Sequence, residues 1–525
     1  MICVTVNKDL YRYEINALFR AFWPEQEVQV IMEGTGPKRQ AEKPEILFQA
    51  GVVYRPDQVE LSIPENPPTG PVLTFTPLPE EMEEFAEGTA VCDEKSHALK
   101  TALKHMLYRA LSQVTGKKLP WGELIGIRPT KLAMEVLENG GTEEQAVRTM
   151  MTEHKVSEEK AVLSAQIAER EKEILSRIHF ENGYSLYVNI PFCPTTCLYC
   201  SFTSFPISAW QDRVDSYLDV LEREMRETSA MMKAQGKVPD TIYIGGGTPT
   251  TLSPAQSDRL LTMISRYFTE GGPKPLEFTV EAGRPDSITA EKVRVLKAHG
   301  VTRMSVNPQT MNDRTLRLIG RRHTVQQTIE AYRCAREAGM DNINMDIILG
   351  LPGESAADVQ HTVDEIVRLS PDDFTVHSLA LKRASRMMKY IEENGFSAIS
   401  NTDETMRIAS EGAARMGLVP YYLYRQKNMS GNFENVGYAR PEKRDENGNI
   451  LSPARYGIYN ILIMEEKQTI LALGAGAITK RVWDRGENGI RIERCENAKE
   501  IDVYMNHIDE MLERKRKLFG LDSKA

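Results

Sequence analysis

An alternation of strand-like and helix-like runs between residues 185 and 381 constrains the fold of this 525-residue chain more than any other feature. Helix-like runs with one apolar face separate short strand-like runs; one holds Val214, Leu218, Leu221 and Met225. This alternation predicts an α/β fold with a parallel sheet and outer helices. Six units close only partly, so we expect a partial (β/α)6 barrel with ligands at the carboxyl ends of its strands. The strand-like runs are Ser185–Ile190, Thr241–Ile244, Glu277–Glu281, Arg303–Val306, Asn342–Leu349 and Phe374–Leu381.

Three cysteines closely follow the first predicted strand, where ligands should gather. Cys193, Cys197 and Cys200 have the spacing of a loop that binds three irons of a [4Fe-4S] cluster and leaves the fourth iron without a protein ligand. The amino and carboxylate groups of S-adenosylmethionine (SAM) can chelate such an open iron. A zinc site is the alternative, but zinc needs four ligands and no further Cys or His lies in or just after this loop. The other cysteines, Cys3, Cys92, Cys334 and Cys495, are scattered, and we expect buried free thiols there.

Composition favours a large soluble protein. The chain is 41% hydrophobic and 26% charged, enough to bury more than one core. No run approaches the ~18 to 20 apolar residues of a membrane span, and the first residues lack the apolar stretch of a signal peptide. A net charge of -9 argues against a dominant electrostatic grip on nucleic acid. We therefore expect a cytoplasmic monomer without a membrane span or a nucleic-acid partner.

The second predicted strand runs straight into three glycines, in the segment Gly245-Gly-Gly-Thr-Pro-Thr250. Glycines after a strand let the backbone approach a ligand closely, which suits the zwitterionic end of SAM. A sharp turn is the plain alternative. A Walker-type phosphate loop is excluded because no Gly-Lys-Ser/Thr ending follows.

Polar residues lie on or after the later strands, where a barrel interior normally holds aliphatic side chains. A buried carboxylate is costly unless it is hydrogen-bonded or paired, and the ribose and ammonium of a bound nucleoside would supply partners. The alternative is that the carboxylates of Glu281 and Asp346 form internal ion pairs with Arg303 or Arg321. The polar residues are Glu281, Gln309, Arg321 and Asp346.

Several motifs together carry a family resemblance. In chain order they are Cys-x3-Cys-x2-Cys, Gly-Gly-Gly-Thr-Pro-Thr, Arg-Met-Ser-Val-Asn-Pro-Gln, Gly-Arg-Arg-His and Asp-Ile-Ile-Leu-Gly-Leu-Pro-Gly, across about residues 184–385. This set resembles the radical SAM family of oxygen-independent coproporphyrinogen III oxidases. A weaker similarity to this family lies at Leu471–Ile478. The region from Tyr421 resembles the long coproporphyrinogen dehydrogenase-like branch of the family.

The resemblance implies both cofactors and an activity. Cys193, Cys197 and Cys200 would ligate the [4Fe-4S] cluster. In the family, a SAM-derived radical removes a hydrogen from a propionate, carbon dioxide leaves and a vinyl group remains, which converts coproporphyrinogen III to protoporphyrinogen IX. Partners would be a tetrapyrrole substrate and an electron donor such as flavodoxin or ferredoxin. The implied SAM contacts are Tyr187, Tyr199, Gly246, Gly247, Thr248, Glu281, Gln309, Arg321, Asp346 and Ala380.

One position departs from the decarboxylating members of the family. They have a further cysteine two places after the triplet, where this chain has Phe202. Phenylalanine at this place resembles the haem-chaperone branch. Two functions therefore stay open: a coproporphyrinogen III dehydrogenase, and a haem-binding carrier without decarboxylase activity. A further interpretation is that Phe202 packs over the cluster and shields it from solvent.

The flanking regions predict further segments. We expect a small α+β domain over residues 1–90, a helical basic segment over 91–180, the barrel over 181–385 and a substrate-covering C-terminal lid region over 386–525. In the lid region, tyrosines and amides would cover the barrel mouth or serve as core. They are Tyr421, Tyr422, Tyr424, Gln426, Asn428 and Asn432.

The basic segment carries a hypothesis about the substrate. Eight basic residues against Glu123 give a net charge of +7 between Lys95 and Lys131. Lys104 and Arg128, with the flat ring of Trp121, would recruit a tetrapyrrole that bears four carboxylates. A solvated basic helix and RNA binding are the alternatives.

Overall fold

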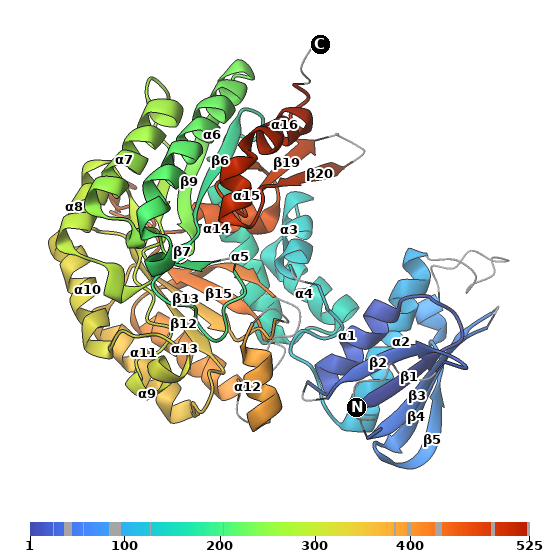
Figure 1. Cartoon of the computed structure of the whole chain (residues 1–525). Helices are drawn as coiled ribbons and strands as arrows, with labels where there is room; N and C mark the ends of the chain where they lie inside the picture. The colour runs from blue at the N-terminus through green and yellow to red at the C-terminus, as the bar shows by residue number, and fades with distance from the viewer. Residues whose placement is uncertain are drawn as a thin grey trace. The chain divides into compact units, whose positions relative to one another are not determined.

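The computed structural model divides into two compact units, Met1–Gln166 and Ile167–Ala525 (Figure 1). The finer division into four segments stays a prediction. Among the described residues, no helix combines the length and apolarity that a bilayer span requires. Cys92, Lys95, Gln426, Asn428 and Asn432 lie outside the described residues. The structure describes residues 1–24, 26–35, 45–55, 57–82, 96–126, 128–202, 204–382, 385–395, 399, 401–425, 433–484 and 489–521.

The first unit contains a five-stranded sheet of order β2-β1-β3-β4-β5, parallel at β2-β1-β3 and antiparallel beyond. Helices α1 and α2 pack together and against this sheet, and their apolar faces complete one core with Phe19, Leu103 and Leu107 at its centre. The expected α+β character of the N-terminal region is thus confirmed, whereas the bounds 1–90 stay a prediction. The elements are β1 (Ile2–Val6), α1 (Arg12–Phe22), β2 (Val28–Met32), β3 (Phe48–Tyr54), β4 (Val59–Asn66), β5 (Thr69–Phe75), α2 (His97–Thr115), α3 (Thr130–Glu138), α4 (Glu143–His154) and α5 (Glu158–Leu175), which crosses the unit boundary.

Helix α2 corrects the hypothesis of a basic recruiting face. Its cations have acidic partners from elsewhere in the unit: Lys100 pairs with Glu14 at 3.0 Å, Lys104 with Glu123 at 3.4 Å and Arg109 with Glu81 at 3.2 Å. Trp121 is 1% exposed, so its ring cannot stack on a macrocycle. The prediction that this segment forms a basic recruiting face is therefore wrong. A charge count within one sequence window ignores the acidic partners that folding brings close.

The second unit is built on an eleven-stranded sheet of order β14-β15-β13-β12-β11-β10-β9-β6-β18-β19-β20. The six predicted strands lie side by side and parallel at its centre, from β6 to β13. The helices between them run along the outside of the curved sheet (Figure 1). Strands β6 and β13 have other neighbours and do not pair with each other, so the barrel stays open as expected. These strands are β6 (Gly183–Ile190), β9 (Val238–Gly246), β10 (Glu277–Val280), β11 (Arg303–Ser305), β12 (Ile343–Leu349) and β13 (Asp373–Ser378).

Several outer helices begin with a capping residue that the sequence shows. For example, α10 and α11 begin at Thr324 and Ser355, whose hydroxyls accept from backbone N–H groups in reciprocal capping boxes. The helices of this unit are α6 (Val214–Ala234), α7 (Pro254–Ile264), α8 (Ala290–Ala298), α9 (Asp313–Leu318), α10 (Val325–Glu337), α11 (Ala356–Leu369), α12 (Met387–Asn394), α13 (Asp403–Arg415), α14 (Ile458–Glu465), α15 (Ile501–Asn506) and α16 (Ile508–Leu518).

The C-terminal region extends the sheet at both edges. Antiparallel β15 and β14 continue it beyond β13, whereas β18 lies parallel to β6 and carries antiparallel β19 and β20. The polar insert after Pro441 forms a largely exposed hairpin. A substrate-covering role for this region stays a prediction. The remaining strands are β7 (Phe192–Cys193), β8 (Phe205–Pro206), β14 (Val419–Tyr424), β15 (Asn435–Ala439), β16 (Lys443–Arg444), β17 (Ile450–Ser452), β18 (Thr469–Leu473), β19 (Ile478–Asp484) and β20 (Ile490–Glu496).

Candidate functional site

The first cysteine is joined to the glycine segment at the carboxyl ends of β6 and β9. Cys193 Sγ lies 3.5 Å from Thr248 Oγ1. The backbone N–H of Thr248 donates to Phe192 O at 2.7 Å, and that of Gly247 donates to Ile190 O at 2.9 Å. The two predicted motifs, more than 50 residues apart in sequence, therefore form one structural unit.

Only glycine fits the middle of the Gly-Gly-Gly segment. Gly246 has φ +107°, and a Cβ there would lie 1.9 Å from Asn189 Oδ1. A Cβ on Gly247 would lie 2.5 Å from Phe192 O. The segment is thus more than a sharp turn, because its glycines allow the backbone to lie directly against the strand that leads to Cys193.

The loop with Cys197 and Cys200 is held by the segment before Arg321. Leu198 N donates to Ile319 O at 2.9 Å, and Thr195 Oγ1 donates to Gly320 O at 2.9 Å. All three thiols of the loop are free and half-buried. Burial raises the pKa of the Cys200 thiol, and Cys197 and Cys193 raise it further.

The donor set fits a cluster better than a single ion. Within the described part of the chain, no three Cys, His, Asp or Glu side chains are arranged to hold one metal ion. Zinc requires four ligands at about 2.3 Å from one centre when they are sulfur. A cubane binds each thiolate to a different iron, so its three sulfurs need not converge on one point. The three thiols of this loop are compatible with that requirement. Of the other cysteines, Cys3 is buried as expected, whereas Cys334 and Cys495 are half-buried.

Two carboxyl groups face the same edge of the sheet with different proton affinities. Burial, together with the charge of Asp346, raises the pKa of Glu281 to about 7. Asp346, on β12, is half-buried, but its pKa is lowered because hydrogen bonds and the nearby His377 outweigh the loss of solvation. Asn344 Nδ2 donates to Asp346 Oδ1 at 2.6 Å, and His377 Nε2 lies 3.8 Å from Asp346 Oδ2. At neutral pH, Asp346 is ionised and Glu281 is close to half protonated.

The alternative that these carboxylates pair internally with arginine is wrong. Arg303 Nη2 donates to Asp373 Oδ2 at 2.5 Å, deep in the sheet. Arg321 Nη1 donates to the carbonyls of Asn307 and Gly283, at 2.5 and 3.4 Å. Neither Glu281 nor Asp346 is therefore held in an ion pair with these two arginines.

The remaining predicted contact residues lie around the same strand ends. Arg321 is buried, and its pKa is raised despite burial by Tyr199 and Cys197, which places these three side chains together. Gln309 has φ +70° and bridges to β12, where its N–H donates to Asp346 O at 3.0 Å. Ala380 is half-buried just after β13.

Comparison with known proteins identifies the family. The family model described as Radical SAM superfamily matches residues 187–366. Oxygen-independent coproporphyrinogen-III oxidase-like protein HemZ of Bacillus subtilis (strain 168) is 37% identical over 443 residues, which cover 84% of this chain and 85% of that relative. The chain belongs to this family of coproporphyrinogen-III oxidase-like radical SAM proteins.

Two further similarities cover less of the chain. Heme chaperone HemW of Bacillus subtilis (strain 168) is 40% identical over 200 residues, 38% of this radical SAM protein and 51% of the chaperone. The solved structure of coproporphyrinogen III oxidase (HemN) from Escherichia coli superposes with a TM-score of 0.48 and 24% identity, over 65% of this chain and 72% of that one.

The candidate site also contains an aromatic layer that sequence reasoning missed. Tyr187 on β6 is stacked with Tyr243 on β9 and with Tyr459 on α14, at centroid distances of 6.1 and 6.0 Å. Tyr243 and Tyr459 stack at 4.5 Å. Tyr243 stands two residues before Gly245 on the same strand face, and this alternation could have indicated it. Tyr459 comes from a distant helix and leaves no local signal.

Phe202 is 71% exposed beside the cysteine loop of this radical SAM protein. The interpretation that its ring packs over the cluster and shields it from solvent stays a prediction. Lys382 Nζ lies 5.9 Å from the ring centroid, a cation–π contact. Phe202 and Lys382 thus present an apolar ring and a cation together at the rim of the site.

The C-terminal tyrosines of this family member divide between core and site. Tyr421 and Tyr422 are buried, and Tyr421 OH donates to Asp373 Oδ2 at 2.9 Å, so both serve as core. Tyr424 OH lies 3.4 Å from His377 Nδ1, next to the partner of Asp346. The turn from Gly474 reaches the end of β6, where Asn189 Nδ2 donates to Ala475 O at 2.5 Å.

Proposed function

We propose that this chain binds a [4Fe-4S] cluster through Cys193, Cys197 and Cys200 and binds SAM along the adjoining strand ends. The contact between Cys193 and Thr248 carries this proposal, because it joins the cysteine loop to a backbone that only glycine can form. When bound, the two cofactors together supply a carbon-centred radical, which is chemistry that no protein side chain provides.

The chain's own groups suit SAM at this place. The backbone of Gly246 and Gly247 can approach the amino-acid end, and the carboxylates of Glu281 and Asp346 offer acceptors for the ammonium and the ribose hydroxyls. Tyr187 and Tyr199 border this space, and Arg321, Gln309 and Ala380 complete it. Holding the nucleoside in one orientation and excluding water are the protein's contributions.

We further propose that the substrate is a tetrapyrrole and that the reaction is the oxidative decarboxylation of coproporphyrinogen III. An electron donor such as flavodoxin or ferredoxin would supply the reducing electron. The name of the B. subtilis relative, which is similar over most of both chains, supports this choice. Binding of haem as a carrier is the second candidate. Phe202 in place of a further cysteine and the similarity to Heme chaperone HemW favour it.

Anaerobic reconstitution separates the two candidates. Protein loaded with iron and sulfide is incubated with dithionite, SAM and coproporphyrinogen III. The dehydrogenase is supported by 5'-deoxyadenosine, carbon dioxide and protoporphyrinogen that all depend on the substrate. Tight haem binding without substrate-dependent SAM cleavage supports the carrier. Protein that takes up zinc and no sulfide contradicts both.

The carrier candidate predicts that Phe202 and Lys382 contact the flat macrocycle of haem. Replacing Phe202 with alanine should weaken haem binding about three- to tenfold, because stacking of one aromatic ring contributes about 0.5–1.5 kcal/mol. Lys382→Met should weaken it as well through loss of a propionate partner. A haem titration followed by Soret absorbance measures both effects. The matched control is Phe180→Ala, since Phe180 is 50% exposed but precedes the amino end of β6. Equal affinities of the two alanine variants would contradict the prediction.

A further inference from the structure

A buried arginine outside the predicted site lies against one of the proposed cluster ligands. Arg284 follows β10 by four residues and is 3% exposed. Its Nη1 lies 3.9 Å from Cys197 Sγ, within hydrogen-bonding range of a sulfur acceptor. Neither the motifs nor the family resemblance indicates this residue.

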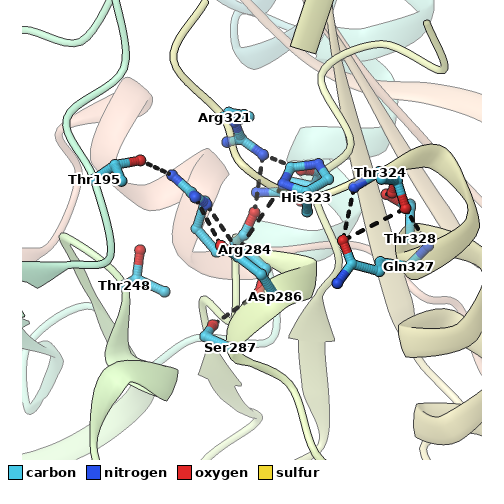
Figure 2. Close-up of polar contacts among 12 residues, drawn as sticks. Thr195, Thr248, Arg284, Asp286, Ser287, Arg321, His323, Thr324, Gln327 and Thr328 are labelled. Atoms are coloured by element: carbon cyan, nitrogen blue, oxygen red, sulfur yellow. Dashed lines mark hydrogen bonds and ion pairs between the residues drawn. The ribbon is translucent and has the colours of Figure 1, made fainter. Parts of the chain in front are cut away.

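The guanidinium of Arg284 is fixed by two neighbours (Figure 2). Asp286 accepts from its Nε at 3.0 Å and from its Nη2 at 2.8 Å, a two-bond fork that sets the plane of the group. Nη1 donates to Thr195 Oγ1 at 2.9 Å, and Thr195 in turn donates to Gly320 O. Arg284 is therefore held to the cysteine loop itself.

The side of the Arg284 guanidinium away from Asp286 faces the sulfur of Cys197. Asp286 occupies the Nε and Nη2 edge, whereas Nη1, on the opposite side, contacts Cys197. His323 lies 3.9 Å from Asp286, and burial together with Arg321 lowers the pKa of this histidine to about 3. Its ring is thus neutral at physiological pH, and Asp286 is paired with Arg284 rather than with an imidazolium.

We propose that Arg284 donates a charge-assisted hydrogen bond to the Cys197 thiolate and thereby raises the reduction potential of the cluster. This inference rests on the proposed cluster. One-electron reduction, by dithionite in the test below, adds a negative charge to the iron–sulfur group and its thiolates. A fixed donor and positive charge at one thiolate stabilise the reduced form more than the oxidised form. Asp286 and Thr195 are positioning residues, because they act through Arg284.

The test is an anaerobic redox titration of reconstituted protein, with the EPR signal of the reduced cluster as the readout. Arg284→Met should lower the equilibrium constant for reduction about tenfold, about 59 mV for one electron, the scale of a hydrogen bond to a charged group. Arg284→Lys, which keeps the charge but not the fork, should shift the potential less and in the same direction.

Arg386→Met is the matched control. Arg386 is exposed and donates to the backbone carbonyl of Thr196 in the same loop, at 2.5 Å, without a sulfur contact. Its removal should leave the potential unchanged. An Arg284→Met protein with full iron and sulfide and a wild-type potential would overturn the inference. If that variant does not retain the cluster, an unchanged potential in Arg284→Lys overturns it. A wild-type protein that forms no cluster overturns the proposed function and this inference together.

Discussion

Replacing Lys515 with methionine is expected to lower the free energy of unfolding by about 3–5 kcal/mol. The side chains of Lys515 and Glu224 are both fully buried, and Lys515 Nζ donates to Glu224 Oε1 at 2.8 Å. Removing the lysine leaves an ionised carboxylate without its counter-charge in a low-dielectric interior. Tyr504 OH and Gly474 N still donate to Glu224, but they do not neutralise it.

The neighbouring residue supplies a matched control. Arg516 on α16 pairs with Glu227 on α6 at 3.0 Å, between the same two helices as the buried pair, but both partners are about one-third exposed. Arg516→Met should therefore cost no more than about 1 kcal/mol. The double variant Glu224→Gln with Lys515→Met should recover part of the loss, because no unpaired charge is left. Urea unfolding, with hydrogen exchange of α16 to isolate this unit, measures these differences. A Lys515→Met protein as stable as Arg516→Met would contradict the prediction.

The same network joins the C-terminal helix to the side of the sheet that holds the proposed SAM site. Glu224 accepts from Gly474 N at 2.8 Å, and the next residue, Ala475, accepts from Asn189 Nδ2 at the end of β6. Asn189 also lies where a Cβ on Gly246 would collide. The C-terminal region is thus joined to the barrel, and loosening α16 should also loosen the backbone beside the proposed SAM site.

The local part of this architecture is predictable from sequence. All six central strands and the helix at Val214 were expected within a few residues, because apolar periodicity reports which local structure buries an apolar face. The cysteine and glycine motifs also meet as expected, since consecutive parallel strands direct their carboxyl ends to one edge.

Pairings between distant segments leave no such pattern. Glu224 and Lys515 are 291 residues apart, and nothing in either helix indicates that its charge is buried. Arg284 contacts Cys197 across 87 residues, and Lys104 reaches Glu123 only once α2 is folded. Sequence windows therefore overstated the charge of the basic segment and missed the cation beside the cysteine loop.

Glu281→Gln is expected to remove the contribution of this residue to the pH dependence of two properties, the stability of this unit and its affinity for SAM. The pKa of Glu281 is raised from 4.5 to about 7 by burial and by Asp346. The folded protein therefore binds this proton more tightly than the unfolded chain. Its stabilising effect is complete below about pH 4.5 and is lost as the pH rises through about 7. At pH 8, the ligand-free glutamine variant should be more stable than wild type by about 1–3 kcal/mol, and at pH 4.5 this advantage should disappear.

SAM should invert this advantage. A ligand ammonium or ribose next to ionised Glu281 favours the deprotonated form, so wild-type affinity for SAM should rise between pH 6 and 8. The glutamine variant should bind more weakly at pH 8 and show no such rise. Thermal unfolding of the ligand-free protein and calorimetric titration with SAM measure the two effects separately. Glu291→Gln, an exposed carboxylate on α8, is the control and should change neither. If Glu281→Gln followed wild type at every pH, the buried carboxyl would not be the group that titrates, and its place in the proposed SAM site would lose its electrostatic basis.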